Sequence, residues 1–371
     1  MKKVLFVFGT RPEAVKLAPV ILEFKKARTF KTIVALTGQH RQMLDQMLDA
    51  FGIRADIDLD LMVRRQTLAG LTASAVTAVS RLLDEQKPDL VVVQGDTTTV
   101  MAASMAAFYA RIPVAHVEAG LRSFDFGHPF PEEFNRIIAD RVSTLHFAAT
   151  PLAKKNLLAE GIPSRHIYVT GNTVVDALKS VLRKKHTFQD RALARFFSAG
   201  SRHILVTAHR RESFGRPLEE ICRALLEIVR RFPDVKVVYP VHLNPNVQHV
   251  ARRLLAKHPR ILLAKPAAYL DLVECMRRSY LILTDSGGIQ EEAPTLGKPV
   301  LVLRKTTERP EAVLAGSARL LGEPRQAKIV REVSRLLKDR KSYKRMAHVR
   351  NPFGDGKAAV RILRAVRDYL D

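Results

Sequence analysis

Short apolar runs that alternate with helix-length amphipathic stretches constrain this chain more than any other feature of its sequence. In the first half the runs cover residues 4–8, 33–37, 90–93, 114–117, 145–149 and 167–169. In the second half they cover residues 204–207, 235–241, 261–264, 281–283, 299–303 and 319–321. Strands that alternate with helices form parallel sheets covered on both faces. Two such series in 371 residues predict an α/β fold with two doubly wound domains.

The boundary between these domains is expected between residues 170 and 201, where charged stretches carry no strand pattern. We place the first domain at residues 1–172 and the second at residues 173–356. Residues 357–371 have a helical pattern, and no strand pattern follows it. They predict a final helix.

The net charge of +24 raises the question of a nucleic-acid partner. The basic residues are spread over predicted helix faces, and the chain has no tryptophan and no stripe of alternating aromatic and basic residues for base stacking. We therefore expect no nucleic-acid partner. A positive field would still attract a small anionic substrate.

The two cysteines, Cys222 and Cys275, lie in helical patterns without CxxC spacing, which predicts neither a disulfide nor a zinc site. No apolar run approaches the roughly 18 residues of a membrane span. The apolar run at residues 4–8 is too short for a signal peptide. We expect a cytoplasmic protein with no membrane partner and no metal.

Residues 115–136 concentrate polar chemistry between an apolar run and a helical pattern. They contain Glu118, Arg122, Asp125, His128, Glu132, Glu133 and Arg136. Glu118 ends a buried-type strand, where desolvation would raise its pKa toward acid/base use. The alternative interpretation is a solvated loop.

Two other strand ends of the first half carry candidate groups. Arg11 and Lys16 flank a helix start with Pro12 in its first turn, and both could reach an anion there. A surface turn is the alternative. Asp96 follows the run at residues 90–93, where Asp is also a common helix N-cap.

In the second half, the run at residues 281–283 leads into Ser286, Gly287 and Gly288. Ser286 suits an N-cap, and the glycines let backbone N–H groups approach a phosphate. Glu291 or Glu292, about one turn further, could bind ribose hydroxyls. A tight loop that needs glycine only for its backbone angles is the alternative.

His209 follows the run at residues 204–207 and precedes two arginines, which favours phosphate binding. We find no convincing motif for binding a nucleotide cofactor. There is no Walker A sequence, and the match to a dinucleotide fingerprint at residues 354–359 follows no predicted strand. We therefore expect no nicotinamide and no other cofactor.

Ten motifs, in this order, resemble the non-hydrolysing UDP-N-acetylglucosamine 2-epimerases. They are FGTRPEAVKLAPV, TGQHRQML, QGDTTT, HVEAGLRS, PFPEEFNR, AHRRESFG, YPVHLNP, TDSGGIQEEAPTLGKPVLVLR, TTERPE and NPFGDG, and they span residues 8–356. The resemblance implies the glycosyltransferase-B-type fold, with two Rossmann-like domains facing an active-site cleft and the final helix packing back on the first domain.

The family interconverts UDP-N-acetylglucosamine and UDP-N-acetylmannosamine, which serve as precursors of cell-surface polysaccharides. The resemblance implies expulsion of UDP to give 2-acetamidoglucal, protonation from the other face and return of UDP. It implies Asp96, Glu118 and Glu132 as acid/base groups, without fixing which acts on which face. His209 would stabilise the diphosphate or the charged intermediate.

The resemblance also implies a set of binding residues. For the substrate these are Arg11, Lys16, Arg136, Ser286, Gly287, Gly288, Glu292 and Arg309. Bacterial members bind a second UDP-N-acetylglucosamine as activator, and the matching positions are Gln39, His40, Gln42, Arg65, Arg210 and His242. Relatives are usually dimers, which implies a homodimer. In many relatives an aromatic residue packs on uracil, and the corresponding segment here offers Tyr269 and Leu272. The resemblance therefore defines the preference for uracil less well than the binding of phosphate.

Four other functions stay open from the sequence. The chain could epimerise another UDP sugar, such as a 2,3-diacetamido uronic acid, whose extra carboxylate would suit the charge of +24. It could be a hydrolysing epimerase that releases N-acetylmannosamine. A glycosyltransferase of the same fold would leave Asp96, Glu118 and Glu132 without a joint role. A binding protein without turnover would not need these carboxylates.

Overall fold

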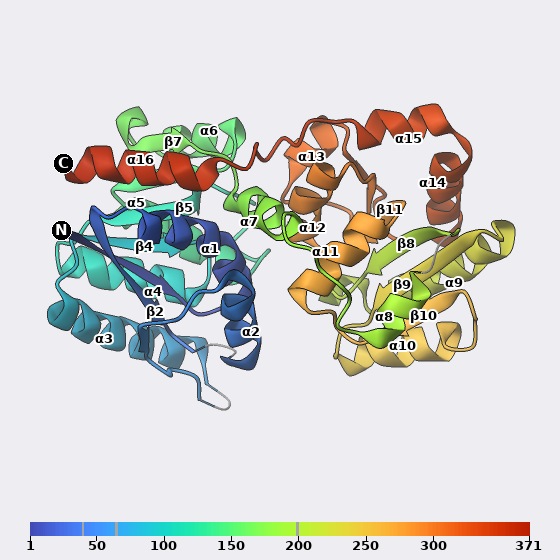
Figure 1. Cartoon of the computed structure of the whole chain (residues 1–371), viewed down its shortest axis with the longest axis horizontal. Helices are drawn as coiled ribbons and strands as arrows, with labels where there is room; N and C mark the ends of the chain where they lie inside the picture. Colours follow the sequence, from blue (N-terminus) through green and yellow to red (C-terminus); the bar gives the residue numbers. More distant parts are fainter. Residues whose placement is uncertain (39–40, 64–65, 198–199) are drawn as a thin grey trace. The chain divides into compact units, whose positions relative to one another are not determined.

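A computed structural model describes residues 1–38, 41–63, 66–197 and 200–371. The chain forms two compact units (Figure 1). The first consists of Met1–Ser180 and Phe353–Asp371, and the second of Val181–Pro352. The domain limits expected from the sequence, after residues 172 and 356, stay a proposal for where independently folding domains separate.

Within its described residues, the first unit has a seven-stranded sheet in the order β3-β2-β1-β4-β5-β6-β7, with parallel pairing throughout. Its strands are β1 (Lys2–Phe8), β2 (Phe30–Leu36), β3 (Ile57–Asp58), β4 (Leu90–Gln94), β5 (Val114–Ala119), β6 (Leu145–Ala148) and β7 (Ile167–Val169). Its helices are α1 (Arg11–Lys26), α2 (Arg41–Phe51), α3 (Leu68–Gln86), α4 (Thr98–Tyr109), α5 (Glu132–Val142), α6 (Pro151–Ala159), η1 (Ser164–His166), α7 (Thr173–Leu182) and α16 (Ala358–Leu370).

The second unit repeats this plan with a six-stranded parallel sheet, counted over the described part of the chain, in the order β10-β9-β8-β11-β12-β13. Its strands are β8 (Arg202–Thr207), β9 (Val235–Pro240), β10 (Ile261–Ala264), β11 (Leu281–Thr284), β12 (Val300–Val302) and β13 (Ala318–Leu320). Its helices are α8 (Arg191–Phe196), η2 (Arg211–Ser213), α9 (Arg216–Arg231), α10 (Pro245–Leu255), α11 (Tyr269–Arg278), α12 (Gly287–Glu292), η3 (Ala293–Leu296), α13 (Pro310–Leu314), α14 (Gln326–Lys338) and α15 (Arg340–Ala347).

The predicted α/β class with two doubly wound sheets is confirmed. Each predicted apolar run overlaps a strand, because these strands are buried on both faces and therefore contain consecutive apolar residues. The sequence did not predict β3, whose two residues, Ile57 and Asp58, are too short to show a pattern. The run at residues 354–359 follows α15 and opens α16, so no strand precedes it as a dinucleotide fingerprint requires.

The core of the first sheet is fully buried along β1, where residues 4–8 have no exposed surface. The helix that follows is fixed at its start by a capping box. Thr10 accepts a hydrogen bond from the N–H of Glu13, and the Glu13 carboxylate accepts one from the N–H of Thr10. Pro12 lies in the first turn, as predicted.

The final helix α16 belongs to the first unit, where it packs against α1 (Figure 1). The Asp176 carboxylate of α7 accepts hydrogen bonds from the first two N–H groups of α16, those of Ala358 (3.2 Å) and Ala359 (3.0 Å). A carboxylate at the positive end of a helix is favourable. The C-terminal segment is therefore fastened to a residue far away in the sequence.

Among the helices of the described residues, none is long and apolar enough to cross a membrane. Cys222 and Cys275 are buried as free thiols. Burial raises the pKa of Cys222 to about 12, so this thiol is unreactive at neutral pH.

Gly120, the residue after β5, provides a test of close packing at the end of the sheet. Its φ is +82°, and a Cβ there would lie 2.3 Å from the carbonyl oxygen of Ala153. Gly161 has the same φ of +82°, but a Cβ there would meet nothing within 4 Å. The two positions differ in steric contact and not in backbone conformation.

We expect Gly161→Ala to lower the free energy of unfolding by about 1–2 kcal/mol, the cost of a left-handed alanine. Gly120→Ala should lose this amount and about 1–3 kcal/mol more, because the methyl group displaces α6. Urea unfolding of both variants measures the difference. Equal losses would show that α6 moves away without cost.

Candidate active site

Glu118, near the end of β5, has an unusual backbone conformation. Glu118 has φ +68°, and the pairing of β5 with β6 shifts register between Val117 and Ala119. A left-handed conformation costs a non-glycine residue about 1–2 kcal/mol, and residues strained in this way cluster at functional sites. The side chain of Glu118 is nevertheless 7% exposed, so it is held in a buried environment.

Three side chains donate hydrogen bonds to the Glu118 carboxylate. Lys16, from the second turn of α1, places its Nζ 2.6 Å from both carboxylate oxygens. Asn172, between β7 and α7, donates from Nδ2 at 3.2 Å. Gln94, the last residue of β4, donates from Nε2. The structure thus brings together Lys16, expected to bind an anion, and Glu118, expected to transfer a proton.

A second carboxylate lies at the end of the neighbouring strand. Asp96 Oδ2 is 2.5 Å from Nη2 of Arg136, a residue of α5. The amide of Asn135 donates to the backbone carbonyl of Asp96 at 2.9 Å. Asp96 is not the N-cap of α4, because Thr97 takes that position and accepts a hydrogen bond from Val100. Its carboxylate is therefore committed to Arg136, and the N-cap alternative is wrong.

The polar loop between β5 and α5 is ordered by the buried Glu133. This carboxylate accepts hydrogen bonds from the N–H groups of Ser123 and Phe124, each at 2.9 Å, and from Arg136 Nη1 at 3.0 Å. Glu133 therefore has a structural role in this loop. The candidate acid/base residue Glu132 is the first residue of α5, beside it.

A buried network under the sheet edge holds the loops that carry Asp96 and Glu118. The His116 ring bonds Asp140 Oδ1 at 2.6 Å through Nδ1 and the carbonyl oxygen of Gly95 at 2.7 Å through Nε2. Asp140 Oδ2 accepts from the N–H of Gly120 at 3.1 Å and from Arg122 Nη2 at 2.7 Å. One carboxylate therefore fixes the turn after β4 and the turn after β5.

Ionisation within this network is shifted from ordinary values. Burial alone would lower the pKa of His116, but the charge and hydrogen bond of Asp140 raise it. Burial alone would raise the pKa of Asp140, but His116 and Arg122 lower it to about 2. Both shifts favour the charged forms of the pair, the imidazolium and the carboxylate.

Glu13 links two strand ends in the same way. Its carboxylate accepts from the N–H of Gly9 at 3.1 Å, after β1, and from the hydroxyl of Thr97 at 2.8 Å, after β4. Burial raises the pKa of Glu13. Arg11, expected to bind an anion, is the first residue of α1 at this edge.

In the second unit, the buried Asp285 organises the strand end that carries His209. Its Oδ2 accepts from the N–H groups of His209 (2.7 Å) and Arg210 (2.8 Å), and its Oδ1 lies 3.1 Å from His209 Nδ1. The hydroxyl of the fully buried Tyr239 donates to the carbonyl oxygen of Ala208 at 2.7 Å. The turn after β8 is thus fixed from two sides, and the His209 ring remains 40% exposed.

The start of α12 has the chemistry of an anion site. A Cβ at Gly287 would lie 3.8 Å from Cζ of Arg309 and 3.9 Å from Nη2 of Arg210, so both guanidinium groups lie close to the helix N-terminus. Ser286 occupies the N-cap position, as predicted, but its side chain makes no capping hydrogen bond.

The two glutamates expected near a ribose differ in their contacts. Glu291 forms an ion pair with Arg309 Nε. Glu292 accepts a hydrogen bond from the hydroxyl of Tyr269 at 2.8 Å, and Tyr269 is buried. Tyr269 therefore contacts the carboxylate that was expected to bind ribose, and Leu272 lies one turn further along α11.

The positions expected for an activator are described only in part. Gln39, His40 and Arg65 lie outside the described residues, and Gln42 is described only as part of α2. Arg210 and His242 are in the second unit, where the His242 ring stacks on that of His209 with centroids 5.6 Å apart. Burial and the neighbouring His209 lower the pKa of His242.

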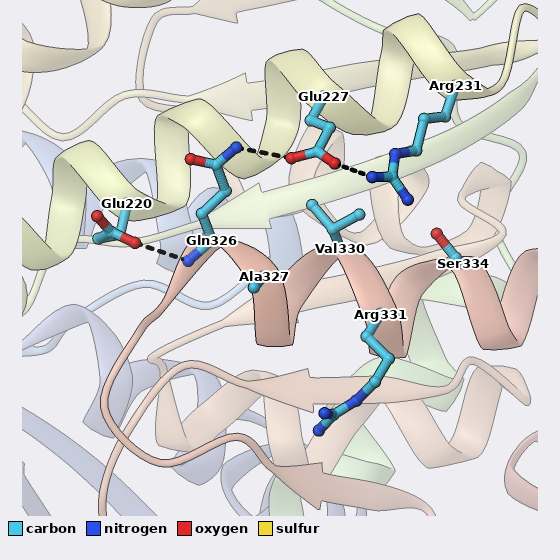
Figure 2. Close-up of a pocket in the computed structure, with 8 residues that line it drawn as sticks. All are labelled: Glu220, Glu227, Arg231, Gln326, Ala327, Val330, Arg331 and Ser334. Atoms are coloured by element: carbon cyan, nitrogen blue, oxygen red, sulfur yellow. Dashed lines mark hydrogen bonds and ion pairs between the residues drawn. The ribbon is translucent and has the colours of Figure 1, made fainter.

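A pocket of about 550 Å³ between α9 and α14 lies away from these strand ends (Figure 2). Figure 2 shows Gln326 bonded to Glu220 at 2.8 Å through its backbone N–H and to Glu227 at 2.6 Å through its side chain. Glu227 also pairs with Arg231. We do not place the active site there, because its two carboxylates already have partners within the pocket.

Sequence reasoning missed residues whose partners are distant in the chain. Gln94, His116, Asp140, Asn172 and Asp285 were given no role. The available signal was a polar side chain at or next to the end of an apolar strand, which Gln94, His116 and Asp285 all show. Over the described part of the chain, no group of three or more His, Cys, Asp or Glu side chains is arranged to hold a metal ion.

Comparisons with known proteins agree over nearly the whole chain. A family model described as UDP-N-acetylglucosamine 2-epimerase matches residues 22–367. The chain is 50% identical to the UDP-N-acetylglucosamine 2-epimerase of Escherichia coli (strain K12) over 372 residues, which cover 99% of this chain and 98% of that protein.

Two solved structures extend this likeness to the fold. The UDP-GlcNAc 2-epimerase of Neisseria meningitidis bound to UDP-GlcNAc has a TM-score of 0.91 at 46% identity, covering 99% of this chain and 100% of that chain. The enzyme of Methanocaldococcus jannaschii in complex with UDP-GlcNAc and UDP has a TM-score of 0.81 at 34% identity, covering 99% of each chain. The predicted two-domain glycosyltransferase-B-type fold is confirmed.

The His116–Asp140 pair gives a pH-dependent prediction. The lowered pKa of Asp140 contributes stability that is fully present above about pH 4, the pKa of an unfolded aspartate, and is lost as the pH falls through about 2. The raised pKa of His116 contributes stability present below about pH 6.5 and lost as the pH rises through its folded value.

Asp140→Asn should therefore lower the free energy of unfolding by roughly 2 kcal/mol near pH 5, and by less at pH values near 3 and 8. Denaturant unfolding of wild type and variant at the three pH values measures this difference. Asp84→Asn, at an exposed position of α3, is the control. A loss that does not change with pH would contradict the ion-pair interpretation.

Proposed function

The chain belongs to the UDP-N-acetylglucosamine 2-epimerase family, and from this premise we propose that it interconverts UDP-N-acetylglucosamine and UDP-N-acetylmannosamine without net hydrolysis. Family membership makes it an epimerase, and hence an isomerase, of a nucleotide sugar. The observation that supports the proposed chemistry best is the pair of carboxylates at adjacent strand ends, Asp96 and Glu118, each held by a cation.

The chemistry explains why carboxylates are needed. The hydrogen on C2 of the sugar has no adjacent carbonyl group, so its direct removal is very difficult. Breaking the bond between C1 and the diphosphate oxygen first gives a cationic ring, whose C2 proton is acidic. Loss of that proton gives 2-acetamidoglucal and UDP. Protonation of C2 from the opposite face and return of UDP to C1 complete the epimerisation.

We assign the proton transfers to the first unit. Asp96, Glu118 and Glu132 are the acid/base groups, because the strand ends and the α5 start place them at one edge of the sheet. Arg11, Lys16 and Arg136 supply positive charge at the same edge, which stabilises the departing diphosphate. The ion pairs with Lys16 and Arg136 keep Glu118 and Asp96 in place.

We assign the nucleotide to the second unit. The start of α12 at Ser286, Gly287 and Gly288, with the guanidinium of Arg309 beside it, supports diphosphate binding. His209, held by Asp285, adds a donor for the diphosphate or the charged intermediate. Glu292 would bind the ribose hydroxyls, and its bond to Tyr269 orients the carboxylate for this role.

Several further points stay proposals. We propose a homodimer, and a second UDP-N-acetylglucosamine as activator near Arg210 and His242, on the resemblance alone. A cytoplasmic location and a role in polysaccharide precursor synthesis likewise rest on the family. The net charge of +24 keeps a UDP-2,3-diacetamido uronic acid as the second candidate substrate, since its extra carboxylate would be attracted by this charge.

Asp96→Asn, Glu118→Gln and Glu132→Gln should each reduce turnover by about 10² or more, the usual contribution of an acid/base group. Binding of UDP, measured by calorimetry, should remain largely intact, because the amides keep the shape of the site. Asp84→Asn, an exposed change of the same kind, should have normal turnover. Normal turnover in all three site variants would disprove the assignment.

Proton NMR with UDP-N-acetylglucosamine in D₂O tests the reaction itself. We expect UDP-N-acetylmannosamine to appear with deuterium at C2, and added nicotinamide cofactor to change nothing. Free N-acetylmannosamine would instead indicate a hydrolysing enzyme. With no reaction at all, the same measurement on the diacetamido uronic acid decides between the two substrates.

A further inference from the structure

We propose that Asn172 is a positioning residue that, together with Gln94, holds Glu118 as an ionised carboxylate, so that Glu118 begins the turnover of UDP-N-acetylglucosamine by accepting the C2 proton and returns it in the reverse reaction. This inference rests on the proposed acid/base role of Glu118. It adds a residue from the segment between β7 and α7 to the site. It also decides the resting charge of Glu118, which the motifs leave open.

The orientation of the Asn172 amide is fixed by its other hydrogen bond. Asn172 Oδ1 accepts from the N–H of Val174 at 3.0 Å, at the start of α7. An N–H donor requires an oxygen acceptor, so the amide nitrogen must be the atom that faces Glu118. Asn172 is 3% exposed and has little room to turn. Its Nδ2 therefore donates to Glu118 Oε1, at 3.2 Å.

Each of these three side chains, Lys16, Gln94 and Asn172, is a donor to the Glu118 carboxylate. Asn172 donates to Oε1, Gln94 donates to Oε2, and the Lys16 ammonium contacts both oxygens. Donors to a carboxylate stabilise its charged form over its protonated form. A proton on Glu118 would point at another hydrogen. The arrangement therefore favours a carboxylate that is ready to accept a proton.

The backbone of Asn172 connects this carboxylate to the end of the chain. Its N–H donates to the carbonyl oxygen of Phe353 at 2.6 Å. Phe353 is buried, and the helix after it, α16, is held by Asp176 (Figure 1). The returning C-terminal segment thus supports the residue that supports Glu118. The return of the chain to the first unit therefore helps to hold the proposed catalytic residue Glu118 in place.

Side-chain support is needed here because the backbone of Glu118 is strained. At φ +68° the residue has a conformation that it would leave without restraint. Gln94 and Asn172 hold the carboxylate from β4 and from the β7–α7 segment, on either side of the strand that carries it. Loss of either donor should change both the position and the ionisation of Glu118.

Two substitutions of Asn172 distinguish a change in the position and ionisation of Glu118 from simple damage to α7. Asn172→Ser keeps an oxygen for the N–H of Val174 but is too short to reach Glu118. Asn172→Asp keeps the same oxygen and places a negative charge beside Glu118. Asn244 has the same local role at the start of α10, where its side chain accepts from Asn246, so Asn244→Ser and Asn244→Asp are matched controls in the second unit.

The readout is the pH dependence of kcat for epimerisation, with thermal unfolding as a check of folding. We expect Asn172→Ser to lower kcat about tenfold with little change in KM, and to move the acidic limb of the profile to higher pH. Asn172→Asp should move this limb further, by about one pH unit, because a like charge opposes ionisation. The Asn244 variants should leave the limb in place.

The outcomes distinguish this inference from the function on which it rests. Full turnover in Glu118→Gln would remove the catalytic role of Glu118 and the inference with it. An inactive Glu118→Gln, with an acidic limb unmoved in both Asn172 variants, would overturn the inference alone. Movement of the alkaline limb instead would show that Glu118 starts protonated, which also overturns it. If Asn172→Asp fails to fold, the limb of Asn172→Ser decides.

Discussion

The ion pair between Glu118 and Lys16 is the interaction on which the first unit's site depends. Two nearly buried charges 2.6 Å apart are favourable only when further hydrogen bonds satisfy the groups that have lost water. Gln94 and Asn172 supply these bonds to Glu118. The site therefore needs α1, β4, β5 and the β7–α7 segment in register at once, and the parallel sheet is what brings them to one edge.

The same principle recurs at each strand end that carries chemistry. A carboxylate that takes no proposed part in the reaction fixes the backbone of the residue that does. Asp140 fixes the turns around Asp96 and Glu118 through His116 and the N–H of Gly120, and Asp285 fixes the turn of His209. Buried carboxylates are costly unless paired, so each of these loops has a single well-defined arrangement. Rigid placement of this kind is what acid/base catalysis requires.

Local patterns predicted much of this molecule. The apolar runs located the strands because strands buried on both faces contain consecutive apolar residues. Pro12 predicted a helix start because proline suits the first helical turn. The glycines at positions 287 and 288 were recognised because they let backbone N–H groups approach a phosphate. The motifs then predicted the family and assigned roles to Asp96, Glu118, Arg136 and Lys16.

The sequence by itself determined the fold class, the family and the residues that carry charge at the strand ends, because these depend on patterns that span a few neighbouring residues. Only the tertiary structure decided which charges meet. Lys16 pairs with Glu118 across 102 positions, and Asn172 contacts both Glu118 and the returning segment at Phe353. It also decided against one local alternative, since Thr97 caps α4 in place of Asp96. Long-range pairing depends on the order and register of parallel strands, which no short stretch of sequence encodes.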